Sequence, residues 1–226
     1  MRAFICIFSI LFTVVGCSSK TDAPGLRETL IAAIKARKEA KENADQPKAP
    51  PAVLTRNDIA HIKKPLLQIE AQTLGIKTLF AQVAQNGAYR TYLNNIKMSV
   101  TMNNGIITAT RGFGLDLLSQ GISIPPQEMF AETNAPKFYT RTQQQLEKAK
   151  SVVEINYNCM LEKADHETVT IVEIDYPLVK FTETCRNPER AFKNYYWIDD
   201  DTRQIWKSAQ SIGQHAGYFI TEVLVP

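Results

Sequence analysis

The chain has 226 residues, with 26 Lys and Arg against 23 Asp and Glu, which gives a formal net charge of +3 at neutral pH. The charges are spread without a long basic run, so the composition argues against a nucleic-acid partner. A hydrophobic share of 44% is ample for one core, and no apolar run reaches the roughly 20 residues that a membrane-spanning helix needs.

An export signal followed by a lipid attachment site opens the chain. Arg2 precedes an apolar stretch over residues 3–15, which is typical of a signal-peptide core. Val14-Val15-Gly16-Cys17 then resembles the bacterial lipobox, which implies cleavage after residue 16 and acylation of Cys17. Two or more acyl chains anchor a protein stably to a membrane. Ser18 stands where an inner-membrane retention signal carries Asp, so the outer membrane is favoured. An ordinary signal peptide with an incidental cysteine is the alternative.

Residues 17–53 are expected to form a lipidated leader. Leu26, Leu30 and Ile34 recur at helical spacing and predict a marginal helix, which would dock on the domain, on a partner or at the lipid surface. Three prolines within residues 43–52 favour an extended linker. A single periplasmic domain is then predicted over residues 54–226.

The first half of this domain is predicted as a short helix followed by β-hairpins. Thr55 with Asp58 three residues later resembles a capping box, and Pro65 prevents the helix from continuing. Asn86-Gly87 and Asn104-Gly105 are dipeptides favoured in tight hairpin turns. We therefore predict strands over residues 66–74, 78–85, 88–93, 97–102 and 106–110, with a helical turn within 112–121.

The second half is predicted as a connecting helix followed by further strands. Residues 137–150 are polar, and we expect them to form the helix that joins the two halves. Apolar and polar residues alternate from 153 to 161, which is the period of a half-buried strand. Residues 164–166 predict a turn after it. The remaining strands are expected over 168–174, 178–185, 192–198, 204–210 and 218–225. The domain is thus predicted to be mainly β, with antiparallel meanders forming a β-sandwich or barrel-like structure.

Cys159 and Cys185 remain as a pair once Cys6 leaves with the signal and Cys17 takes lipid. A disulfide between them is favoured in an oxidising compartment, and two buried free thiols are the alternative. On the first and third strands of a meander the two residues would be about 10 Å apart, so the bond requires the middle strand to start late or the sheet to fold over. Neither cysteine has a Cys or His nearby at zinc-ligand spacing.

No group of residues indicates a catalytic site, a metal or a cofactor. His61, His166 and His215 share no ligand spacing, and each is expected to be a solvated or capping side chain. The acidic run 199–201 lacks the Gly-centred loop and closing Glu of a calcium site. No small-residue elbow surrounds a serine. Carboxylates on the predicted strands could pair as in sugar hydrolases, but a solvated sheet face explains them equally well.

An aromatic cluster provides the candidate contact residues Tyr195, Trp197 and Trp206. Aromatic rings on one face of a hairpin can stack on sugar rings or anchor a partner protein. Alternation along the strand places Tyr196 on the face opposite to Tyr195 and Trp197. At least half of the cluster is therefore expected to pack in the core.

Several segments together resemble one protein family. The hairpin from Met98 to Gly112, followed by Gly114 and Asp116-Leu117-Leu118, is similar to the YjbF/GfcB lipoproteins of group 4 capsule and exopolysaccharide operons, as are 196–198 and 205–208. The resemblance implies an all-β periplasmic domain on the outer membrane that serves secretion or assembly of a surface polysaccharide beside other envelope proteins. It implies no catalytic residue. A carbohydrate-binding module is the alternative function, followed by a polysaccharide-modifying enzyme.

Overall fold

The computed structural model describes residues 54–131, 135–146, 151–213 and 216–226. The chain divides into two compact units, Met1–Ala52 and Val53–Pro226, and every described residue belongs to the second. The signal peptide 1–16, Cys17, the leader 17–53 and His215 lie outside the described residues. No helix in the described part of the chain combines the length and the apolarity needed to cross a membrane.

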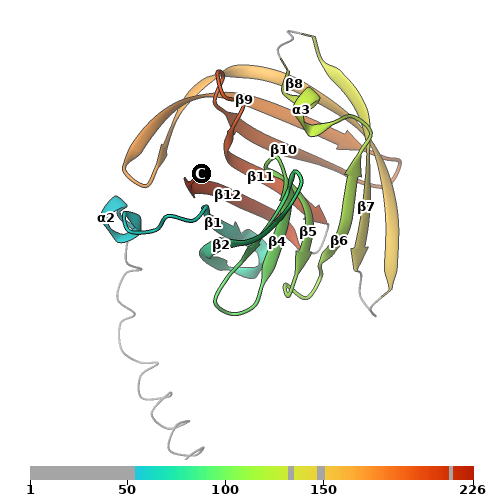
Figure 1. The fold of residues 1–226 in the computed structure, drawn as a ribbon. Helices are drawn as coiled ribbons and strands as arrows, with labels where there is room; N and C mark the ends of the chain where they lie inside the picture. The colour runs from blue at the N-terminus through green and yellow to red at the C-terminus, as the bar shows by residue number, and fades with distance from the viewer. Residues whose placement is uncertain (1–53, 132–134, 147–150, 214–215) are drawn as a thin grey trace, which may run out of the picture. The chain divides into compact units, whose positions relative to one another are not determined.

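Within the described residues, twelve antiparallel strands form one sheet that curls into a nearly closed barrel (Figure 1). The prediction of a mainly β domain is thus confirmed. The strand order is β5-β4-β3-β2-β1-β12-β11-β10-β9-β8-β7-β6, so β5 and β6 are the two edges. The strands are β1 Leu66–Ala71, β2 Ile76–Asn86, β3 Tyr89–Leu93, β4 Ser99–Asn103, β5 Ile106–Arg111, β6 Leu117–Ile122, β7 Lys137–Leu146, β8 Val152–Ile171, β9 Ile174–Arg186, β10 Ala191–Ile198, β11 Ile205–Gly213 and β12 Gly217–Val225.

Three short helical segments accompany the sheet: α2 (Arg56–Ile59), the 3₁₀ turn η2 (Gln72–Leu74) and α3 (Pro126–Met129). The predicted capping box begins α2, because the backbone N–H of Thr55 donates to Asp58 Oδ2 at 2.8 Å. The hydrogen bonds that the backbone N–H and the hydroxyl of Thr55 donate to Asp58 lower the pKa of its carboxyl group. The proline at the start of α3 suits a position where no intrahelical N–H is needed.

The prediction of a connecting helix over residues 137–150 was wrong. Residues 137–146 form strand β7, and the short helix between β6 and β7 is α3. Alternate residues of β7 point into the barrel, where Arg141, Gln143 and Gln145 are buried. A strand whose inward face is polar lacks the hydrophobic alternation that would have revealed it. The helical turn expected within 112–121 is also wrong, since β6 begins at Leu117.

The turn predicted at residues 164–166 is wrong as well. Strand β8 continues through them, and the register with β9 shifts between Lys163 and His166 in a bulge. The chain reverses instead at Val172 and Glu173, where φ is 42° and 65°. Cys159 and Cys185 consequently lie directly opposite each other on the neighbouring strands β8 and β9. The separation of about 10 Å expected for first and third strands does not arise.

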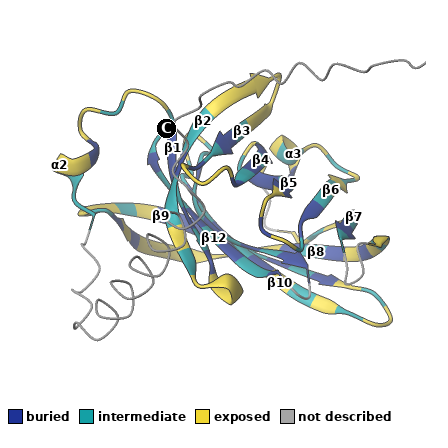
Figure 2. Cartoon of the chain, turned by 90° about the horizontal axis from the view of Figure 1, so that it is seen from below, coloured by how far each residue is buried: buried dark blue, intermediate teal, exposed yellow. Residues whose placement is uncertain are grey.

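Two clusters of buried apolar side chains fill the barrel, and a third lies outside it. The first cluster includes Phe80 and Phe219, and the second includes Phe181 and Tyr196. The third packs against the opposite face of β1 and β12, where the end of the β8–β9 hairpin covers the sheet. Figure 2 shows the contrast with the end of the β2–β3 hairpin, whose residues 83–90 are exposed.

Arg56 of α2 links the backbone segments that surround the third cluster. Its guanidinium donates hydrogen bonds to the carbonyl oxygens of Ile171 and Val172, each at 2.6 Å, and of Leu224 at 2.9 Å. One side chain thereby joins the end of β8 to β12, where it satisfies carbonyl groups that the strand ladders leave free.

Candidate functional site

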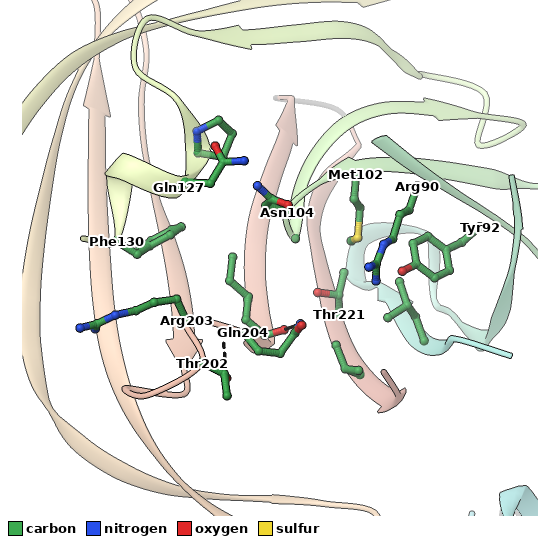
Figure 3. A pocket seen from close by; sticks show the side chains of 15 residues that line it. Arg90, Tyr92, Met102, Asn104, Gln127, Phe130, Thr202, Arg203, Gln204 and Thr221 are labelled. Atoms are coloured by element: carbon green, nitrogen blue, oxygen red, sulfur yellow. Dashed lines mark hydrogen bonds between the residues drawn. The ribbon is translucent and has the colours of Figure 1, made fainter. Parts of the chain in front are cut away.

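A pocket of about 400 Å³ opens at one end of the barrel, where the β4–β5 and β10–β11 turns meet α3 (Figure 3). Such a volume lies at the lower end of the range for small-molecule sites. Its floor is the inward face of β1, β11 and β12. Its walls come from β3 and β4 on one side and from α3 on the other. The floor residues are Leu67, Ile205, Thr221 and Val223, and the wall residues include Arg90, Tyr92, Met102, Gln127 and Phe130.

Gly105 allows the β4–β5 turn to lie against the floor of this pocket. Its φ is +82°, and a Cβ atom added there would lie 2.8 Å from Cδ1 of Ile205. A residue with a side chain would be strained in its backbone and would also clash. The Asn104-Gly105 turn, which the sequence predicts, is therefore also the element that shapes the pocket wall.

Gln210 secures the same turn from across the barrel. Its Oε1 accepts a hydrogen bond from the N–H of Ile107 at 3.0 Å, and its Nε2 donates to the carbonyl oxygen of Gly105 at 2.8 Å. The side-chain amide thus pairs with the edge of β5 as a neighbouring strand would. This satisfies two buried backbone groups at the sheet edge.

The charge of the pocket is cationic. Its lining contains Arg90 and Arg203 and no Asp or Glu. Arg203 is already paired, with Nη1 2.7 Å from Asp200 Oδ1, and Figure 3 shows its side chain directed away from Arg90. No carboxylate pairs with Arg90 within the described residues. Burial raises the pKa of the neighbouring Tyr92, although Arg90 acts in the opposite direction, so the phenol stays protonated.

A second hollow of about 360 Å³ lies between the two sheet edges, β5 and β6. Within the described residues, no strand ladder joins β5 to β6, and side chains bridge the gap between these two edges. Gln120 Nε2 donates to the carbonyl oxygen of Ile107 at 2.7 Å, and Thr110 Oγ1 accepts from the N–H of Leu117 at 3.0 Å. Arg111 Nη1 also donates to the carbonyl oxygen of Leu117 at 3.1 Å. The barrel is therefore closed by side chains at this line.

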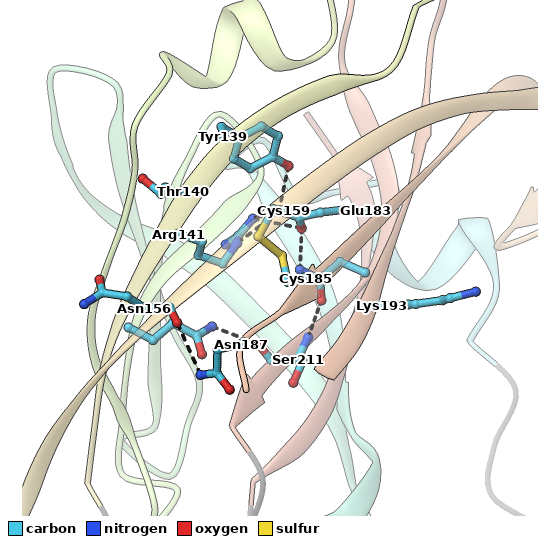
Figure 4. Close-up of a disulfide and its surroundings, with 12 residues drawn as sticks. Tyr139, Thr140, Arg141, Asn156, Cys159, Glu183, Cys185, Asn187, Lys193 and Ser211 are labelled. Carbon is cyan, nitrogen blue, oxygen red and sulfur yellow. Dashed lines mark hydrogen bonds and ion pairs between the residues drawn. A yellow bond between two sulfur atoms is a disulfide. The ribbon is translucent and has the colours of Figure 1, made fainter. Parts of the chain in front are cut away.

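A completely buried ion pair lies deeper inside the barrel (Figure 4). Arg141 Nη2 is 2.7 Å from Glu183 Oε1 and 2.9 Å from Oε2. Tyr139 and Tyr196 donate their hydroxyl hydrogens to the carboxylate at 2.7 and 2.9 Å, and Asn194 Nδ2 donates at 2.6 Å. Every partner comes from β7, β9 or β10, so the network joins these strands.

The ion pair holds both of its members in the charged form. Burial alone would raise the pKa of Glu183, but the Arg141 charge and the hydrogen bonds from Tyr139, Arg141 and Asn194 lower it below its usual range. Burial would lower the pKa of Arg141, and Glu183 raises it again. Burial and the Glu183 charge raise the pKa of Tyr139 and Tyr196, which remain hydrogen-bond donors.

A disulfide joins Cys159 to Cys185 beside this network, with their Cα atoms 4.1 Å apart (Figure 4). The two sulfurs and a Glu183 oxygen lie within 4.8 Å of one another, which is close enough for three metal ligands. Thiolates are the form of cysteine that binds zinc, and these two sulfurs are bonded to each other. The donor set therefore does not fit a metal ion.

The aromatic residues predicted as contacts lie on the outer face of the sheet, away from the pocket. Trp197 Nε1 donates to Glu167 Oε2 at 2.6 Å, and the ammonium groups of Lys180 and Lys207 lie 5.2 and 5.8 Å from the centre of the Trp197 rings. Trp206 stacks on Tyr176, with ring centres 4.4 Å apart. Tyr195, Trp197 and Trp206 are all half-buried, whereas Tyr196 faces the core as alternation predicts.

The histidines and the acidic turn lie on the surface. His61 and His166 are both exposed, in agreement with the sequence prediction. Asp199 Oδ1 accepts a hydrogen bond from the backbone N–H of Thr202 at 2.7 Å, and the Thr202 hydrogen bonds lower the pKa of Asp199. The run 199–201 thus serves as a hairpin turn.

Two comparisons with known proteins found matches. The model of the family described as group 4 capsule polysaccharide lipoprotein gfcB, YjbF matches residues 27–224. The crystal structure of the hypothetical lipoprotein YmcC from Escherichia coli (K12) has a similar fold, with a TM-score of 0.65 and 15% sequence identity. The match covers 91% of this chain and 98% of that chain. No curated protein matches the sequence.

Proposed function

The chain belongs to the group 4 capsule polysaccharide lipoprotein family, and on that basis we propose that it assists the secretion or assembly of a capsule or exopolysaccharide without catalysing a reaction. It would act in the periplasm, anchored to the outer membrane through acylated Cys17, beside envelope proteins of the export system. The family match over residues 27–224 carries this proposal, since it covers almost all of the chain after the signal.

The chemistry of the interior supports a role in binding. The carboxylate of Glu183 already accepts hydrogen bonds from four side chains and has no free position for a substrate. The pocket lining contains no His, Cys, Ser, Asp or Glu. General acid–base catalysis requires a group with a pKa near the working pH, and the raised pKa of Tyr92 is far from it.

Direct binding of the exported polysaccharide is the second candidate. The pocket favours it, because an apolar floor and amide side chains are combined there, as in many small-molecule sites. The outer aromatic residues Tyr195, Trp197 and Trp206 provide a different surface for the same contact. Two lysines already lie over the Trp197 rings, so a sugar would have to displace them.

Deletion and replacement of Cys17 would test the accessory role. A strain that lacks the protein is expected to lose surface polysaccharide, and the wild-type chain is expected to restore it. Cys17→Ala should abolish labelling with radioactive palmitate, release the protein from the membrane fraction and fail to restore the polysaccharide. Cys6→Ala, which changes a cysteine within the signal, should label normally. An unchanged amount of surface polysaccharide in the deletion strain would contradict the proposal.

A further inference from the structure

We propose that the pocket at the barrel mouth binds an acidic saccharide, with its carboxylate on Arg90 and its ring over the apolar floor. This inference rests on the proposed function, because that function brings the protein into contact with a polysaccharide. It adds the charge of the ligand and the place where it binds.

Arg90 is the group that selects a negative charge. It is exposed at the rim, and Figure 3 shows its side chain in the pocket beside Tyr92. A guanidinium forms two parallel hydrogen bonds with a carboxylate, an arrangement stronger than neutral hydrogen bonds. The paired Arg203 contributes little free charge, since Asp200 lies 2.7 Å from it. Arg90 shares a hydrogen bond with Tyr92, and a ligand carboxylate would supply the counterion that it lacks among the described residues.

The remaining lining suits a sugar ring. Leu67, Ile205 and Val223 form an apolar floor on which the C–H face of a ring can pack. Asn104 and Gln127 stand at the rim, and their side-chain amides make no hydrogen bond within the described residues. Each amide offers both donors and an acceptor, which matches the mixed character of sugar hydroxyl groups.

The wall opposite Arg90 is held rigidly in place. The ring of Phe130 contacts Phe181 and Tyr196 edge to face, with centres 5.4 and 5.1 Å apart. Tyr196 is fixed in turn by its hydrogen bond to Glu183. A wall fixed before the ligand arrives lowers the entropy lost on binding. The buried ion pair thus supports the shape of the pocket from below.

The test measures binding to the full chain purified from membranes in detergent micelles. Isothermal titration would compare a tetramer of galacturonic acid with a neutral tetramer of glucose. We expect saturable binding of the acidic tetramer only, with an affinity that falls as salt is added. Arg90→Gln should weaken this binding at least tenfold, and Arg90→Lys should retain part of it. Arg186→Gln is the matched control, because Arg186 is exposed on β9 and does not line the pocket.

Three results would overturn the inference, provided that each variant melts at the wild-type temperature. The first is that the neutral tetramer binds as tightly as the acidic one, and the second is that Arg90→Gln leaves the affinity for the acidic tetramer unchanged. The third is that a tetraglutamate peptide binds as tightly as the acidic tetramer, which would indicate an acidic protein segment as the ligand. The accessory role is judged separately by the deletion strain. Loss of polysaccharide in that strain without any binding of the acidic tetramer would reject the pocket assignment and leave the accessory role standing.

Discussion

Arg141 and Glu183 meet inside the barrel from β7 and β9, two strands that β8 separates in the sheet. Their side chains span the intervening strand to reach a distance of 2.7 Å, with both groups fully buried. The pair therefore fixes how strongly the sheet curls at this point.

Glu183→Gln should destabilise the protein strongly. The substitution keeps the shape of the side chain and leaves the buried Arg141 charge without a counterion, which is expected to lower the free energy of unfolding by about 3–5 kcal/mol. Glu70→Gln is the matched control, because Glu70 lies 3.5 Å from Lys77 in a solvent-exposed ion pair. Its loss should cost less than about 1 kcal/mol. Urea unfolding measures both, and equal losses would contradict the role given to burial.

The stability of the protein should fall at acidic pH, and Glu183 should account for part of the fall. Its pKa is lowered in the folded state, while the unfolded chain takes up a proton near the ordinary value of about 4.3. The stabilisation is therefore complete above that pH and is lost as the pH falls towards the folded-state pKa.

Urea unfolding between about pH 6 and pH 3 would test this dependence. The free energy of unfolding should decrease less steeply with falling pH in Glu183→Gln than in the wild type. Identical slopes in the two proteins would assign the acid sensitivity to other carboxylates.

Removal of the disulfide should weaken the domain without abolishing the fold. Cys159 and Cys185 are 26 residues apart in the sequence, and closing a loop of that size stabilises a protein by about 3.5 kcal/mol in the chain-entropy model. The double variant Cys159→Ala/Cys185→Ala should show this loss in denaturant unfolding. Reducing agent should destabilise the wild type and leave the double variant unchanged. Free thiols at both positions in the untreated protein would refute the bond.

Gln210→Met should loosen the β4–β5 turn. Methionine preserves the length of the side chain, but it leaves the N–H of Ile107 and the carbonyl oxygen of Gly105 without partners. Unpaired buried groups cost about 1–3 kcal/mol each. Hydrogen exchange at the Ile107 amide should accelerate, whereas Gln85→Met, on the exposed end of β2, should have no such effect. An unchanged exchange rate would mean that another group holds the edge of β5.

Local sequence signals were sufficient for much of the barrel. Asn104-Gly105 forms the predicted hairpin turn, and the hairpin predicted at Asn86-Gly87 also forms, although its turn residues are Gly87 and Ala88. The alternation from 153 to 161 correctly orients the residues of β8. These signals succeed because turn geometry and the inward or outward facing of a strand depend on neighbouring residues. The ends of the strands were predicted less accurately, since the sequence signals of a bulge, such as the one between Lys163 and His166, resemble those of a turn.

The buried polar network could not be found in the same way. Arg141 looks like a solvated residue because its partner Glu183 is 42 residues away and only the sheet brings them together. The sequence does contain a clue, since every second residue from Tyr139 to Gln145 is buried, in phase with the strand period. The turn at Val172-Glu173 has no comparable signal, because a β-branched residue rarely adopts a positive φ.

The pairing of β1 with β12 determines when the barrel can be completed. Synthesis proceeds from the N-terminus, so β1 to β5 exist as a meander long before the partner of β1 has been made. Until then one edge of β1 carries unpaired backbone groups, which can pair with any other exposed strand. Contacts between distant parts of a chain also form slowly. A chain that ended before Gly217 would leave both β1 and β11 with open edges, and it would aggregate rather than fold.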